Sequence, residues 1–269
     1  LFVFFFFFFF FFFFLSFFRF SSGGAHLNPA ISLAFALLRP HAFGPRKMAR
    51  YMAAQLVGGF LGGALTYGLY HQHIAAFERA AGLDRGGHGS ERSAMVLCEY
   101  FPNPSLANNT TLVSVGEAFG VELLGTGVLA TVIFSLTDSC NNAVQRREGV
   151  PGLIGLTVAM LISVLAPLTQ AGLNPARDLG PRLVALAAGW GHVAVPGPRD
   201  GFWVYILGPL FGAPLGAALV TYVLNRPCRD DDACCDCADA KPPCSASAPC
   251  GSPAACVAGP LPDSRLTAV

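Results

Sequence analysis

The chain has 269 residues, of which 53% are hydrophobic and only 12% are charged, and its formal net charge is +1. A soluble globular domain carries about 25% charged residues, so this composition excludes an ordinary soluble protein and indicates a membrane protein. The near-neutral charge gives no basis for a nucleic-acid partner.

Five apolar stretches are long enough to cross a bilayer, which takes about 20 residues. In chain order they are Leu1–Phe20, Met48–Tyr70, Val115–Leu136, Val150–Gln170 and Gly201–Leu224. The first is almost entirely phenylalanine and lacks the basic start and small-residue cleavage site of a signal peptide. We interpret it as a low-complexity apolar tract in the place of a span.

The tetrapeptide Leu-Asn-Pro-Ala occurs twice, with its asparagine at Asn28 and at Asn174. Asn is a good helix N-cap and Pro suits the first helical position, so each copy predicts the start of a short helix. Three spans lie between the copies, which places them on opposite membrane faces as an inverted repeat. We therefore expect two half-helices that meet near the membrane midplane, N-terminus to N-terminus.

Basic residues predict the orientation through the positive-inside rule. They fall in the loop after the first copy, in the loop between the third and fourth spans, and after the last span: Arg39, Arg46, Lys47, Arg50, Arg146, Arg147 and Arg226. That side is predicted to be cytoplasmic, together with the C-terminus. The loop from His71 to Ser114 then lies outside and contains two overlapping glycosylation sequons at Asn108 and Asn109.

The tail, residues 226–269, is a separate kind of segment that holds seven of the nine cysteines. It is rich in Ala, Pro, Cys, Ser and Asp, and we expect it to be disordered. Two alternatives stay open: palmitoylation of its juxtamembrane cysteines, or binding of soft metals by clustered thiolates. Its spacing does not match a paired zinc motif, and the sequence predicts no structural metal and no cofactor.

The motifs predict a pore for neutral solutes. Each helix N-terminus carries about half a positive charge, and each motif asparagine can add amide donors. Arg177, directly after the second copy, adds a fixed positive charge beside the path. Such a site accepts lone pairs and repels cations. No nucleophile–base pair or phosphate-binding loop accompanies it, so an enzyme is not expected.

The stretches SGGAHLNPA, GLNPARDLGPR, GVELLGT and ILGPLFGAPLGA resemble the aquaporin, or major intrinsic protein, family. The resemblance implies an all-α inverted-repeat bundle of six spans and two half-helices, assembled as a homotetramer in the lipid bilayer. The channel domain would be residues 1–225. Because five spans are visible, we expect the first to be missing, with the Phe tract in the place of the second. The sequence begins with Leu1, and we expect it to be truncated.

The resemblance also implies roles for individual residues. Asn28 and Asn174 would be the central pair of donors, and Arg177 the arginine of the outer filter. Glu122 would brace the second re-entrant loop; the alternative is an ordinary packed polar residue. Backbone carbonyls would line the path at Gly24, Ala25, His26, Gln170, Ala171 and Gly172.

The remaining filter positions, counted from the two motifs by the resemblance, are Phe8, Ile162 and Ala171. Asp178 and Arg182 resemble the glycerol-conducting branch, as does Ile206, whereas Tyr205 resembles the water-selective branch. Asp178 also has a simpler explanation, a helix-start acid near a positive dipole. We predict a broad pore for water, glycerol and urea. The alternatives are a strictly water-selective pore and a non-conducting truncated product with a structural role.

Overall fold

The computed structural model describes residues 26–106, 113–138, 141 and 149–224. Three helices are long and apolar enough to cross a membrane: α3 (Pro45–Ala81), α5 (Val115–Leu136) and α6 (Val150–Thr169). A fourth such segment contains α8 (Val204–Leu219), which continues into a π-helical turn at Val220–Leu224. The shorter helices are α2 (Pro29–Leu38), α4 (Glu91–Ala94) and α7 (Pro175–Ala185). The described residues form no strand, and the predicted all-α fold is confirmed.

The predicted spans match the helices to within a few residues, apart from the end of α3. Helix α5 has the predicted bounds, and α6 stops one residue early, at Thr169. The end predicted at Tyr70 is wrong, because α3 runs on to Ala81 and ends at Gly82 with a left-handed φ of 62°. His73 therefore lies in a helix and not in a loop. Hydropathy marks where a helix leaves the apolar layer, whereas a C-terminal glycine marks where it ends.

The extension of α3 is held by a polar cluster outside the predicted membrane layer. Arg85 donates to both carboxylate oxygens of Glu78 (Nε–Oε1 3.0 Å, Nη2–Oε2 2.7 Å) and to the Tyr67 hydroxyl. Its guanidinium lies 4.3 Å from the ring centroid of Trp190, which is fully buried. Ser93 completes the cluster, since it donates to Glu78 and accepts from the Trp190 indole.

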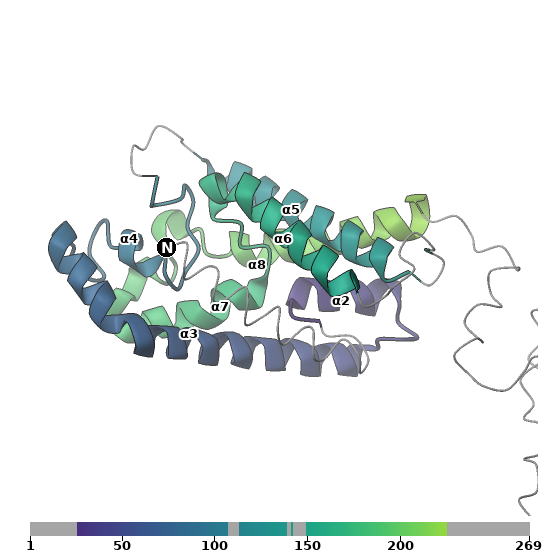
Figure 1. Ribbon diagram of the computed structural model, residues 1–269, viewed down its shortest axis with the longest axis horizontal. Helices are drawn as coiled ribbons and strands as arrows, with labels where there is room; N and C mark the ends of the chain where they lie inside the picture. Colours follow the sequence, from purple (N-terminus) through teal and green to yellow (C-terminus); the bar gives the residue numbers. More distant parts are fainter. Residues whose placement is uncertain (1–25, 107–112, 139–140, 142–148, 225–269) are drawn as a thin grey trace, which may run out of the picture.

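The two half-helices lie between α3 and a group of three long helices. Figure 1 shows α5, α6 and α8 stacked on one side, with α3 running along the other and α2 and α7 between them. Helix α7 packs on α3, and α2 packs on α8. The two tips therefore lie inside the bundle.

Glycines allow the backbones of α5 and α8 to touch. A Cβ built on Gly212 would lie 2.2 Å from the Leu123 carbonyl oxygen, and one on Gly216 would lie 2.0 Å from that of Gly127. No side chain fits at either distance. This close contact is typical of helix association in membranes, where small residues permit dense packing.

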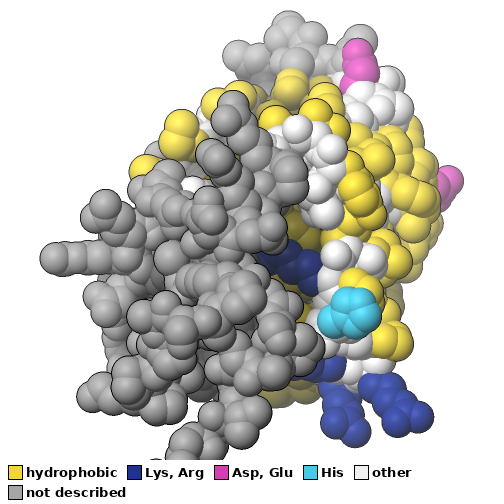
Figure 2. Space-filling model, turned by 90° about the vertical axis from the view of Figure 1, so that its right-hand side faces the viewer, with side chains coloured by type: hydrophobic (Ala, Val, Ile, Leu, Met, Phe, Trp, Pro, Cys, Tyr) yellow, Lys and Arg dark blue, Asp and Glu magenta, His cyan; other side chains and the backbone are white. Residues whose placement is uncertain are grey.

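The long helices expose apolar side chains to their surroundings. On α6 these are Leu153, Leu156, Met160 and Val164, and on α3 they include Val57, Leu61 and Leu65. Figure 2, which views the end of the molecule at the right of Figure 1, shows many hydrophobic side chains on its coloured surface and Lys and Arg side chains mostly at its lower edge. The exposed basic residues at the start of α3 are Arg46, Lys47 and Arg50. Apolar side chains along the helices, next to a basic helix start, are typical of a helix bundle embedded in a bilayer.

The Phe tract, the two sequons and the tail lie outside the described residues, and so do Phe8, Gly24 and Ala25. The expectations for them remain predictions.

Candidate functional site

Each half-helix begins at its motif asparagine, as predicted. The side-chain oxygen of Asn28 accepts from the Ala30 backbone N–H at 2.9 Å, and that of Asn174 accepts from Ala176 at 3.0 Å. Proline follows at the first helical position in both copies. The caps satisfy donors that would otherwise be unpaired at the helix start.

The two caps also bind each other's loops. The Asn28 amide nitrogen donates to the Leu173 carbonyl at 2.7 Å, and the Asn174 amide nitrogen donates to the Leu27 carbonyl at 2.9 Å. The tips therefore meet, and Figure 1 shows α2 and α7 extending away from each other. We call this pair of hydrogen bonds the clasp; each asparagine amide uses one of its two N–H groups in it. Two positive helix ends thus face one point inside the bundle.

Glu122 meets the loop that precedes the second half-helix. Its Oε1 accepts from the Thr169 hydroxyl (2.7 Å) and the Gly172 N–H (3.0 Å), and its Oε2 accepts from the Leu173 N–H (2.6 Å). Glu122 is fully buried on α5. All three neighbours donate, which is the arrangement a buried carboxylate requires.

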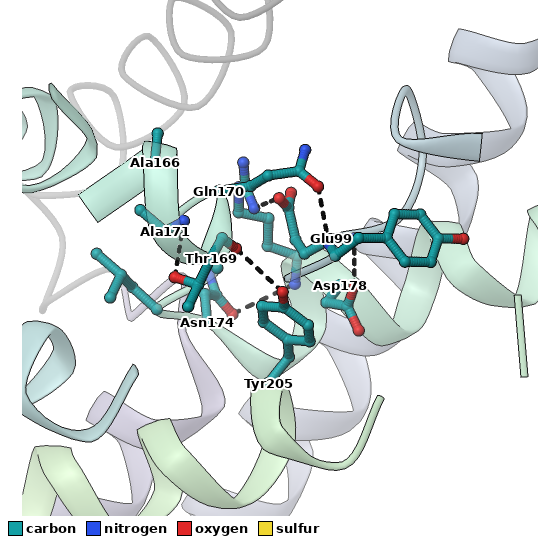
Figure 3. Close-up of polar contacts among 12 residues, drawn as sticks. Glu99, Ala166, Thr169, Gln170, Ala171, Asn174, Asp178 and Tyr205 are labelled. Carbon is teal, nitrogen blue, oxygen red and sulfur yellow. Dashed lines mark hydrogen bonds and ion pairs between the residues drawn. The ribbon is translucent and has the colours of Figure 1, made fainter. Parts of the chain in front are cut away.

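The loop held by Glu122 has an unusual backbone. Gln170, Ala171 and Leu173 have positive φ values of 62°, 57° and 53°. Each such non-glycine residue costs about 1 kcal/mol or more and persists only where neighbours fix it. Tyr205 adds a further bond, because its hydroxyl donates to the Thr169 carbonyl at 3.1 Å. The loop is thus anchored by Glu122 from α5 and by Tyr205 from α8, and Figure 3 shows the Tyr205 contact.

Arg177 lies in the first turn of α7, directly after the second tip, and forms an ion pair with Glu99. Glu99 precedes the cis bond Phe101–Pro102 by two residues and is buried. Sequence analysis missed it. The available signal was a lone acid in the apolar stretch MVLCEYF.

Asp178 and Arg182 are buried behind Arg177 and form an ion pair at 2.7 Å. Arg182 also donates to the carbonyls of Ala194 (2.7 Å) and Glu99 (2.6 Å). These contacts join α7 to the loop that carries Glu99. Ile162 and Ile206 are half-buried on α6 and α8, and Ala171 is buried in the loop.

The first tip has a support that the sequence did not reveal. Gln55 of α3 donates from Nε2 to the His26 carbonyl at 2.6 Å and to the Ser32 hydroxyl at 3.0 Å. The His26 carbonyl, expected to line the path, therefore already accepts one hydrogen bond. Gln55 lies in the sequence AAQLVGG, where nothing distinguished it from other polar residues of a span.

Two half-helix tips that meet inside a bundle of membrane-crossing helices, with amides at the junction and a guanidinium beyond it, form a passage for small uncharged molecules. The fold and site thus define a membrane channel for neutral solutes.

The family model of the major intrinsic proteins matches residues 7–220. The glycerol uptake facilitator protein of Pseudomonas aeruginosa is 43% identical over 205 residues, which cover 76% of this chain and 70% of the relative. The propanediol uptake facilitator PduF of Citrobacter freundii is 41% identical over 210 residues, 77% of this chain and 74% of the relative. Among solved structures, the aquaglyceroporin from Plasmodium falciparum matches with a TM-score of 0.61 and 28% identity, over 75% of this chain and 73% of that one. The chain belongs to the major intrinsic protein family.

Proposed function

We propose that this channel conducts glycerol and other short polyols together with water. The observation that carries the proposal is the composition of the outer mouth. Arg177 provides donors on one side, while the filter positions at Ile162 and Ala171 are apolar. A polyol presents hydroxyl groups along one edge and C–H groups along the other, so it fits a path with one polar and one apolar wall.

The similarity to facilitators for glycerol and propanediol supports the same solute class. Asp178, Arg182 and Ile206 are the residues that resemble the glycerol-conducting branch. In this proposal Asn28 and Asn174 offer their second amide N–H to the passing solute, and Glu122 keeps the second tip in place. The helix dipoles and Arg177 repel cations.

The test is permeation into vesicles that contain the purified chain. We expect vesicles in a glycerol gradient to shrink and then reswell faster than empty vesicles, while a six-carbon polyol produces no reswelling. Accelerated water flux without glycerol flux would instead establish the strictly water-selective alternative. The absence of both fluxes would favour the non-conducting alternative.

Assembly and orientation are part of the proposal. The exposed apolar faces of α3 and α6 suit a homotetramer in the bilayer, which light scattering in detergent would measure. The basic start of α3 would face the cytoplasm, as would the C-terminus. Protease accessibility of the tail in oriented vesicles would test that orientation.

A further inference from the structure

The loop segment around Glu99 is fixed by side chains from the second half-helix and the loop before it. The Glu99 N–H donates to Asp178 Oδ1 at 2.9 Å, and the Glu99 carbonyl accepts from Arg182 Nη2 at 2.6 Å. The neighbouring Tyr100 N–H donates to Gln170 Oε1 at 2.8 Å. Figure 3 shows Glu99 beside Gln170 and Asp178. The N–H and the carbonyl of Glu99 both have hydrogen-bond partners, so the backbone that carries its side chain is held in place.

The Glu99 side chain points to Arg177. Glu99 Oε1 accepts from Arg177 Nη1. The other carboxylate oxygen, Oε2, is buried and has no hydrogen-bond partner among the described residues. A carboxylate buried with one satisfied oxygen is costly, and the Asp178–Arg182 pair keeps it there. A side chain kept at such a cost next to a pore arginine indicates a role beyond packing.

We propose that Glu99 is a positioning residue of the outer filter, whose ionised carboxylate holds the Arg177 guanidinium against the loop and offsets its charge. The inference rests on the proposed channel function. Asp178 and Arg182 then contribute to solute selection from behind the wall, because they fix the segment that carries Glu99.

The environment of Glu99 gives this contact a dependence on pH. Burial raises the pKa of the Glu99 carboxyl to about 7, although the adjacent Arg177 lowers it. The other charged or titratable groups facing it are Asp178 and Arg182 on α7, Glu122 on α5, Tyr205 on α8, and Cys98 and Tyr100 in its own segment. Burial raises the pKa of the Cys98 thiol to about 12, so this thiol does not titrate near neutrality.

The sign follows from which form binds Arg177. Above about pH 7 the carboxylate is ionised and the ion pair is intact. Below that pH the carboxyl is protonated, so Arg177 loses its ion pair with Glu99. We expect the guanidinium to shift toward the path, where it narrows the mouth and makes it more positive. Glycerol flux should therefore fall several-fold as the pH is lowered, with a midpoint near the pKa of Glu99.

The experiment measures glycerol and water permeability of vesicles containing the full chain between about pH 5.5 and pH 8.5, a window that brackets the Glu99 pKa. The key variant is Glu99→Gln, which retains the size and an acceptor oxygen but cannot ionise. We expect it to give a low, pH-independent glycerol flux. The matched control is Glu91→Gln in the same loop, which should keep the wild-type midpoint.

Two results would overturn the inference. A flat wild-type profile would do so without any variant, and so would a Glu99→Gln profile that keeps the wild-type midpoint, since that would place the titrating group elsewhere. Wild-type vesicles with neither glycerol nor water flux would refute the proposed function, and this inference with it.

Discussion

The Glu122→Gln substitution tests how strongly the second tip depends on one carboxylate. The amide oxygen can replace Oε1, which accepts from Thr169 and Gly172. The amide nitrogen must then face the Leu173 N–H, which at present donates to Oε2 at 2.6 Å. Two donors would meet in a site where Glu122 is fully buried. The substitution therefore changes charge and hydrogen bonding but hardly changes volume.

The expected cost follows from those three bonds. Losing one hydrogen bond to a charged group costs about 1.5–3 kcal/mol, and leaving the buried Leu173 N–H unpaired adds to that. The two remaining bonds weaken because their acceptor becomes neutral. We expect the free energy of unfolding to fall by about 3–5 kcal/mol in total. Glycerol flux should fall as well, because the positive-φ residues lose the contact that holds them.

The assay measures unfolding of the purified chain in mixed detergent micelles and monitors it by circular dichroism. Glu117→Gln is the matched control on the same helix, since Glu117 is exposed in the capping box with Ser114 and glutamine serves equally there. Because Glu117 is exposed, this control should unfold with nearly the stability of the unsubstituted chain. Equal stabilities of the two variants would refute the brace.

Three further predictions follow from packing and filter geometry. Gly216→Ala should lower the free energy of unfolding by about 1–3 kcal/mol or more, because the new Cβ would meet the Gly127 carbonyl oxygen. The control is Gly120→Ala, which has open space around it and should raise the free energy of unfolding by up to about 1 kcal/mol in the same assay. Ile162→His should narrow the mouth and lower glycerol flux about tenfold if it raises the barrier by about 1.4 kcal/mol; unchanged vesicle reswelling would contradict the filter assignment. Arg85→Ala should cost about 3 kcal/mol of unfolding free energy because it strands the buried Glu78 carboxylate, while the exposed Arg79→Ala should stay within about 0.5 kcal/mol.

The spans and half-helices could be predicted because their signals are local. Asn-Pro gives a helix start, and an apolar run gives a crossing, so the bounds of α5 followed directly from the sequence. The end of α3 could not be found in this way, since residues 71–81 are polar enough to leave the membrane yet remain good helix formers. The local signal for that end was Gly82, which takes the left-handed conformation there and which the hydropathy argument did not use.

The contacts that position the site depend on residues far apart in the chain. Glu99 and Arg177 are separated by 78 positions in the chain. Gln55 and His26, which are joined by a hydrogen bond, are separated by 29. A single sequence carries no pattern that pairs them. Arg177 was identified because it follows a motif, whereas Glu99 lies in a loop without one. Family resemblance indicated Glu122 as a brace, but only coordinates give its three donors.

The clasp between Asn28 and Asn174 has a consequence for biogenesis. Each asparagine needs a carbonyl beside the other, and the ribosome makes the first tip 146 residues before the second (174 minus 28). During synthesis the first tip therefore waits inside the membrane without its partner, and only insertion of the last segments supplies it. The junction of the two tips is therefore complete only after the second motif, Asn174, has been made and inserted.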